Sequence, residues 1–259
     1  MNTNPKIKYH ENGIKAYEQW VVDGYYHRID GPAFQSWDIN GNKNFEKWFK
    51  HNVKHREGAP ASQGWYANNQ KQYENWWLNG KKHSENTPAY IRYGINGIRL
   101  EEEWYLNGVL HRIGSPAKQK WSVCGQILQE EWWINGIRNR EDGPAYSRWH
   151  RNNQIAHTEW WENDILHKVD TPARKQWFNN GKPSCEVWSF NGAAHRKNGP
   201  AIQEWFKTGR IKYEGWFING KELSNTELKK YKKWLKEYNL LNKTIWTDEE
   251  MVLWVLTWQ

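Results

Sequence analysis

Polar and aromatic residues alternate along most of this chain in a pattern that returns every 28 residues. In residues 32–60, two alternating segments with aromatic residues flank the dipeptide Asn40-Gly41. Alternation with a period of two is typical of β-strands, and Asn-Gly predicts a type I′ hairpin turn between them. A second turn signal follows in each unit, and a small residue before proline, such as Gly31-Pro32, closes it. Each unit is therefore predicted to form two strands and a shorter third extended piece.

The repeat runs without insertion or deletion through most of the chain. Every unit is closed by a Pro-Ala step, at Ala33, Ala61, Ala89, Ala117, Ala145, Ala173 and Ala201. A tryptophan recurs with the same spacing, at Trp20, Trp48, Trp76, Trp104, Trp132, Trp160, Trp188 and Trp216. Fixed-period similarity is typical of arrays in which each unit buries its apolar face against its neighbours. We therefore expect an all-β fold, an elongated antiparallel β-meander or solenoid of about eight units over residues 1–224.

Both faces of the second predicted strand are apolar. Glu46 and Trp48 point to one face, and the same pairing recurs in most units. The other face carries a more variable column, Val21, Phe49, Trp77, Tyr105, Trp133, Trp161, Ser189 and Phe217. One interpretation makes one column the core and packs the other against neighbouring strands. The other interpretation makes the variable column an exposed binding stripe, with the candidate residues Phe49, Trp77, Tyr105, Trp133, Trp161 and Phe217.

A histidine and a cation precede most of the prolines. The candidate polar column is His27, Arg28, His55, Arg56, His111, Arg112, His195 and Arg196. Equivalent positions lie two or three strands apart, about 10–14 Å, whereas zinc ligands converge to about 2 Å from one ion. We therefore expect this column to be structural and to pair with the glutamates that precede the tryptophans. The sequence shows no catalytic motif, so we predict a protein that is not an enzyme and has no metal or cofactor.

The repeat stops after Asn219-Gly220, and the pattern becomes helical. Ser224, Asn225 and Thr226 are candidate helix caps. An apolar stripe follows at Leu228, Tyr231, Leu235 and Tyr238, and basic residues occupy the opposite face at Lys229, Lys230, Lys232, Lys233 and Lys236. A capping box at Thr247 starts a second helix, with Met251, Trp254, Val255 and Trp258 on one face. Residues 225–259 are predicted to form a helical cap; the alternative is a basic helix that lies on an anionic surface.

Composition bears on the type of core, the class of partner and the compartment. Only 37% of the 259 residues are hydrophobic, while 21 Trp and 13 Tyr can supply the buried area that aliphatic residues lack. The net charge of +8 permits, as a lesser alternative, binding to nucleic acid or an anionic membrane. The sequence has no leader-like start and no segment long enough to span a bilayer. Cys124 and Cys185 occupy unequal repeat positions, which favours unpaired thiols and a cytoplasmic location.

The motif W-x-x-N-G-x-x-H-R-x-D-G-P-A, approximated by Trp20–Ala33 and Trp132–Ala145, resembles the MORN-repeat variants of large DNA viruses, phages and some bacteria. The resemblance covers residues 8–224. It implies a single-layer, twisted antiparallel sheet and a binding or scaffolding role, sometimes at membranes. It supplies no catalytic residues. For a viral protein it would imply a place in the host cytoplasm or the virion.

Together these features predict a non-enzymatic repeat scaffold that binds a protein partner, or self-associates, through its aromatic face. One alternative is a ligand-binding array that uses the aromatic and His-Arg columns for a nucleotide, nucleic acid, sugar or choline-like cation. Another alternative is a scaffold associated with an anionic membrane. Steep weakening by salt would favour a phosphate-bearing partner over a protein partner.

Overall fold

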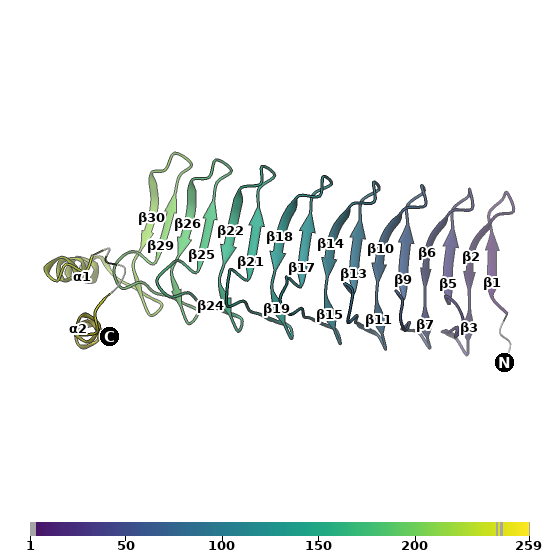
Figure 1. Cartoon of the computed structure of the whole chain (residues 1–259), viewed down its shortest axis with the longest axis horizontal. Coiled ribbons are helices and arrows are strands. Elements are labelled where there is room, and N and C mark those ends of the chain that lie inside the picture. The colour runs from purple at the N-terminus through teal and green to yellow at the C-terminus, as the bar shows by residue number, and fades with distance from the viewer. Residues whose placement is uncertain (1–3, 242, 244–245, 259) are drawn as a thin grey trace. The chain divides into compact units, whose positions relative to one another are not determined.

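The computed structural model describes residues 4–241, 243 and 246–258. Its contacts divide the chain into two compact units, Met1–Arg138 (unit 1) and Asn139–Gln259 (unit 2). Each unit is built mainly from antiparallel strands that follow one another in chain order, and unit 2 ends in two helices (Figure 1). The predicted all-β meander with C-terminal helices is therefore confirmed. The division between the units falls inside the repeated region.

Two long strands from each repeat form the sheets. In unit 1 they are β1 (Lys6–Tyr9), β2 (Lys15–Gln19), β5 (Phe34–Trp37), β6 (Lys43–Lys47), β9 (Ser62–Trp65), β10 (Lys71–Asn75), β13 (Tyr90–Tyr93), β14 (Arg99–Glu103), β17 (Lys118–Trp121) and β18 (Ile127–Glu131). In unit 2 they are β21 (Tyr146–Trp149), β22 (Ile155–Glu159), β25 (Arg174–Trp177), β26 (Pro183–Val187), β29 (Ile202–Trp205) and β30 (Ile211–Gly215). Within each unit every long strand pairs with the next one in the sequence. No closed barrel forms among the described strands.

The second predicted strand is interrupted at its tryptophan, which corrects the sequence interpretation. β6 ends at Lys47, and Phe49–Lys50 belongs to a separate hairpin as β7. The Trp48 amide donates to the Ala61 carbonyl at 2.7 Å, and its own carbonyl accepts from the His55 amide. Both hydrogen bonds take Trp48 out of the strand ladder. The alanine is fully buried in every Pro-Ala step, so only a small side chain fits there.

Each interrupted strand continues into a short two-stranded hairpin (Figure 1). In unit 1 the hairpins are β3 (Val21–Val22) with β4 (Tyr25–Tyr26), β7 (Phe49–Lys50) with β8 (Val53–Lys54), β11 (Trp77–Leu78) with β12 (Lys81–Lys82), β15 (Tyr105–Leu106) with β16 (Val109–Leu110), and β19 (Trp133–Ile134) with β20 (Ile137–Arg138). In unit 2 they are β23 (Trp161–Glu162) with β24 (Ile165–Leu166), β27 (Ser189–Phe190) with β28 (Ala193–Ala194), and β31 (Phe217–Ile218) with β32 (Lys221–Glu222). A repeat thus holds two long and two short strands.

The two turns of a repeat differ in type. At the first turn Gly41 has a φ of 85° while Asn40 does not adopt a positive φ, so the predicted type I′ turn is wrong at this position. Instead the Asp38 carboxylate accepts the amides of Asn40 and Asn42. Next to this turn, the register of the β5–β6 ladder shifts between Ser36 and Trp37. The second turn does have two positive φ values, 48° at Asn79 and 77° at Gly80, as a type I′ turn requires.

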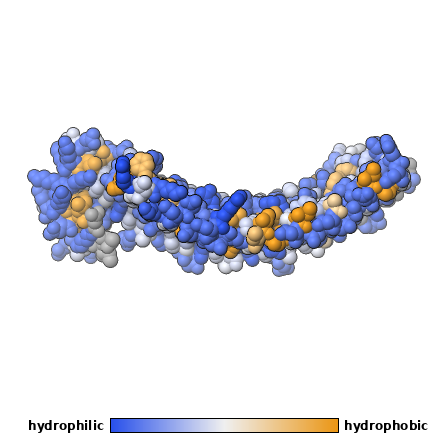
Figure 2. Space-filling view, turned by 90° about the horizontal axis from the view of Figure 1, so that it is seen from above, coloured by the Kyte–Doolittle hydropathy of each residue, from blue (hydrophilic) through white to orange (hydrophobic). Residues whose placement is uncertain are grey.

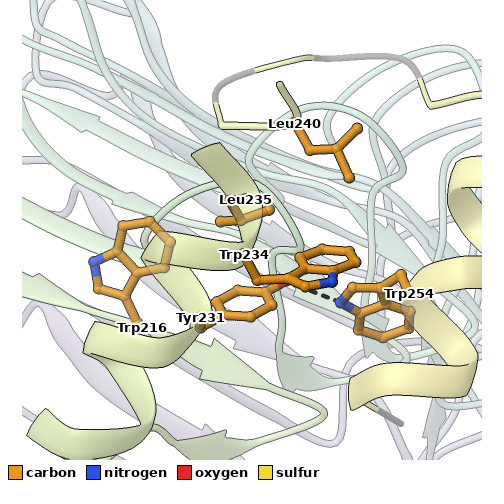
Figure 3. Packing of buried hydrophobic residues seen from close by; sticks show 6 residues of the cluster. All are labelled: Trp216, Tyr231, Trp234, Leu235, Leu240 and Trp254. Atoms are coloured by element: carbon orange, nitrogen blue, oxygen red, sulfur yellow. Dashed lines mark hydrogen bonds between the residues drawn. The ribbon is translucent and has the colours of Figure 1, made fainter. Parts of the chain in front are cut away.

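The C-terminal helices build the main apolar core of unit 2. They are α1 (Asn225–Glu237) and α2 (Asp248–Trp258), capped by the Ser224–Glu227 and Thr247–Glu250 pairs. The core contains Trp216, Tyr231, Trp234, Leu235, Leu240 and Trp254 (Figure 3). Tyr231 and Leu235 are buried as the stripe predicts, whereas Tyr238 is 48% exposed. The helices therefore cover the tryptophan of the last repeat.

Candidate functional site

The arginines of the His-Arg column lie on the recurring tryptophans. The Arg56 Cζ atom lies 3.9 Å from the centroid of the Trp48 ring, and Arg112 lies at the same distance from Trp104. The equivalent pairs are Arg28 on Trp20 at 4.2 Å, Lys168 on Trp160 at 3.7 Å and Arg196 on Trp188 at 3.9 Å. Burial lowers the pKa of Arg56 and of Arg112. Since one face of each guanidinium is covered by an indole, these cations are integrated into the fold.

The glutamate column meets these arginines in part. The carboxylates of Glu18, Glu46 and Glu102 lie 3.4, 3.7 and 3.3 Å from Arg28, Arg56 and Arg112 respectively. Trp20 and Trp104 also donate their indole N–H groups to the glutamate two residues earlier. Glu74 instead contacts Lys71 and the Tyr93 hydroxyl, because its repeat has Ser84 at the position where other repeats have an arginine. The predicted Glu–Arg pairing is therefore present for Arg28, Arg56 and Arg112, whereas Arg196 is held by Asn198, the Pro200 carbonyl and the Trp188 ring.

The histidines have a different role from the one predicted. Each accepts, at Nδ1, the backbone amide of the second turn in the next repeat rather than pairing with a glutamate of the column. The acceptors are His27, His55, His83, His111, His167 and His195, at 3.0–3.3 Å. Asn139 accepts the Asn163 amide in the same way through its side-chain oxygen. The column thus joins successive repeats, which the sequence could not show because the partners lie 24 residues apart.

The variable aromatic column is neither bare nor fully buried. Phe49, Trp77, Tyr105, Trp133, Trp161 and Phe217 are all half-buried, as are most tryptophans of the first column. Lys54 lies over the Trp77 ring at 4.7 Å, and Lys82 lies over the Tyr105 ring at 4.5 Å. The Tyr105 hydroxyl donates to Glu103 at 3.1 Å. Burial and the negative charge of Glu103 both raise the pKa of Tyr105. The expected contrast between a core column and an exposed column is absent from the described rings.

The candidate basic helix presents most of its lysines to solvent. Lys229, Lys230, Lys233 and Lys236 are exposed. Lys232 is half-buried, and its ammonium lies 4.7 Å from the centroid of the Trp216 ring. Lys232 therefore provides Trp216 with a cation over its ring, as arginines do for the tryptophans of earlier repeats. No described helix is long and apolar enough to cross a membrane.

Unit 1 carries a row of exposed apolar side chains that the sequence analysis missed. The row, here called the hairpin row, consists of Tyr25, Val53, Val109 and Ile137, which are 51, 43, 44 and 41% exposed. Each is the first residue after the second turn, and Lys81 takes this position in the remaining hairpin. A Cβ atom on Gly80 would lie 3.1 Å from Val53 Cγ1, so the row packs closely on the glycine of the next turn. The sequence did contain a signal for this row, since an apolar residue follows the second turn in most of these repeats.

Other exposed hydrophobic residues also share one position of the repeat. In Figure 2 they form separate patches within a largely hydrophilic surface. Ile39, Ile95 and Val123 are exposed at the first turn, between 56 and 64%. Single exposed apolar residues are common on protein surfaces. The hairpin row differs because Val53 and Val109 pack against the glycine of the next second turn, Gly80 and Gly136 respectively.

Unit 2 contains a cavity of about 490 Å³ between its last repeats and α2. Its walls include Trp188, Phe190, Trp246, Met251, Trp254 and Val255, and its polar lining includes Lys168, Asp170, His195, Arg196 and Lys197. Sequence reasoning missed it because α2 and β27 meet only in the folded chain. The volume is in the range of small-ligand sites, about 300–1,000 Å³.

The described residues contain no group of three or more His, Cys, Asp or Glu that could hold a metal ion. No protein-family model matches this chain, and no curated protein matches it significantly. The resemblance to MORN-repeat variants therefore stays a prediction. The geometry leaves two candidate binding surfaces, the hairpin row of unit 1 and the cavity of unit 2.

Proposed function

We propose that the protein is a non-enzymatic scaffold that binds a protein partner along the hairpin row of unit 1. The observation that carries this proposal is that exposed apolar residues occupy one position in four of the five hairpins of unit 1, with Lys81 at this position in the other. Burial of apolar area is the main favourable term in most protein–protein association. A row with a fixed repeat spacing suits a partner that presents apolar side chains at several points.

The contacts of the other columns favour this surface over the predicted aromatic stripe. The rings of Trp77 and Tyr105 are already covered by lysines, and the arginines of the His-Arg column lie on tryptophans. A ligand-binding array built on these groups would have to displace internal contacts. The four side chains of the hairpin row carry no charge and form few hydrogen bonds, and only the hairpin of Lys81 places a cation at this position. The row therefore suits an apolar protein segment better than a nucleic acid or sugar. A scaffold role also agrees with what the MORN resemblance implies.

The test compares two triple variants with the same change in charge. Val53→Lys/Val109→Lys/Ile137→Lys alters the row at positions where Lys81 shows that lysine is accommodated. The control, Ile39→Lys/Ile95→Lys/Val123→Lys, alters the first turns, whose side chains are more exposed than those of the row and where another repeat has Lys207. A partner captured by the unaltered protein is purified, and its affinity for all three proteins is measured by biolayer interferometry.

We expect the row variant to bind at least about tenfold more weakly, because losing a few buried aliphatic side chains removes well over 1.4 kcal/mol. The control variant should keep the original affinity. Binding through the row should also change little between low and high salt. Equal affinities for the row and control variants would overturn the proposal. Self-association that only the row variant loses, measured by sedimentation, would show that the partner is a second copy.

A further inference from the structure

The cavity of unit 2 has apolar walls from two parts of the chain. Trp188 and Phe190 come from the repeats, and Trp254 and Val255 come from α2. Phe190 is 45% exposed, so its ring is available to a ligand. The Trp254 indole N–H is already used, because it donates to the Tyr231 hydroxyl at 2.9 Å (Figure 3). The walls therefore offer ring faces and aliphatic groups to a ligand.

Two lysines at this cavity have weak partners. The Lys197 ammonium lies 3.1 Å from the Met251 sulfur and 5.0 Å from the centroid of the Trp254 ring. The Lys168 ammonium lies over the Trp160 ring. Neither lysine is within ion-pair distance of a carboxylate in the part of the chain that the structure describes. A thioether and an indole face are much poorer partners for an ammonium group than a carboxylate.

His195 adds a neutral donor to the same lining. Its Nδ1 accepts the Asn219 amide at 3.0 Å, which places the ring proton on Nε2. In an earlier repeat the corresponding His55 Nε2 faces the Glu57 carboxylate at 3.7 Å. At the cavity the residue two positions after the histidine is Lys197, so this carboxylate is replaced by a cation. Burial, with the charge of Lys197, lowers the pKa of His195 to about 4 and keeps the ring neutral at pH 7.

The remaining charged groups leave the cavity with an excess of positive charge. Arg196 is held by Asn198, by the Pro200 carbonyl and by the Trp188 ring. Among the described residues of the lining, Asp170 is the one carboxylate, whereas Lys168, Arg196 and Lys197 are cations. A partly buried site with excess positive charge and weakly partnered lysines attracts a negatively charged group more strongly than an exposed surface does.

We propose that this cavity binds an aromatic or aliphatic carboxylate, with the apolar body against Phe190 and Trp254 and the carboxylate at Lys197. Charge-assisted hydrogen bonds from Lys197 and from His195 Nε2 would hold the carboxylate. Two sources could supply this chemistry: a free organic acid, or a peptide that ends in an aromatic residue with a free C-terminus. This inference does not depend on the hairpin row.

The test uses the matched pair 2-naphthoate and 2-naphthamide, which share shape and differ in charge. Isothermal titration calorimetry with the full chain should give a Kd for naphthoate at least about tenfold lower than for the amide, as one charge-assisted hydrogen bond implies. Lys197→Gln should remove this preference and leave the amide affinity unchanged. Lys230→Gln removes an exposed lysine of α1 and should retain the preference. Circular dichroism checks that both variants are folded.

Absence of naphthoate binding, equal affinities for acid and amide, or a preference that survives Lys197→Gln would each overturn the proposal. A peptide ending in phenylalanine, with a free or an amidated C-terminus, distinguishes the sources. Tighter binding of the free-carboxylate peptide than of naphthoate would identify a protein C-terminus as the ligand. Tighter binding of naphthoate would identify a small acid, and either result supports the shared chemistry.

Discussion

Replacing Glu102 by alanine should destabilise unit 1 far more than replacing an exposed glutamate. The residue lies in β14 and is only 3% exposed. Its carboxylate accepts the Trp104 indole N–H at 3.1 Å and contacts the Arg112 guanidinium at 3.3 Å and the Arg99 guanidinium. Alanine removes the acceptor and leaves a half-buried N–H and a half-buried cation without their carboxylate.

The magnitude follows from these contacts. Removing one partner of a buried ion pair costs about 3–5 kcal/mol. Arg112 keeps its hydrogen bond to the Pro116 carbonyl at 3.1 Å and its indole contact, so we expect the lower end, about 3 kcal/mol. Glu102→Gln keeps an acceptor for Trp104 and loses only the charge. Its loss should be about 1–2 kcal/mol, since hydrogen bonds to charged groups contribute about 1.5–3 kcal/mol.

Urea denaturation followed by circular dichroism gives the free energy of unfolding of each variant. The control is Glu85→Ala, because the Glu85 side chain is 75% exposed and lies 4.0 Å from His83. Its loss should stay within about 0.5 kcal/mol. A double-mutant cycle with Arg112→Ala should show a coupling of at least about 0.5 kcal/mol. If Glu102→Ala costs no more than Glu85→Ala, the carboxylate is not a buried partner and the reasoning fails.

Three further predictions concern other contacts. A Cβ atom on Gly31 would lie 2.5 Å from the Arg28 guanidinium. Gly31→Ala should therefore lower the free energy of unfolding, measured by urea denaturation, by about 1–3 kcal/mol. In a chain that already carries Arg28→Ala, the same change should lower it little. The pKa of His195 is about 4 when folded and about 6.5 when unfolded, so its contribution to stability is present above pH 6.5 and is lost as the pH falls to 4. His195→Asn, which copies the Asn139 acceptor, should flatten the thermal stability in that window; an unchanged pH profile would contradict the assignment. Deleting residues 225–259 uncovers Trp216, which is 6% exposed, and should lower the melting temperature and solubility; a truncated chain as stable and soluble as the full one would rule out the cap.

The repeat, the hairpins and the helices could be predicted because their signals are local. Alternation in residues 43–47 acts through side chains two positions apart, and capping at Ser224 acts within one helical turn. The buried alanines also repeat in the sequence itself. The C-terminal stripe identified Tyr231 and Leu235 for the same reason, since a helix sets the spacing of its own faces.

Contacts between distant residues were decided only by the tertiary structure. The strand breaks at Trp48 because its amide bonds the carbonyl of Ala61, and His55 serves the turn of the next repeat rather than a glutamate. The cavity needs α2 beside Phe190, a contact that no periodicity specifies. Local sequence sets which elements form and how often they recur, since neighbouring residues control backbone shape. Which polar groups meet, and which apolar ones stay exposed, depended on packing between neighbouring repeats, because hydrogen bonding and burial are properties of the folded neighbourhood.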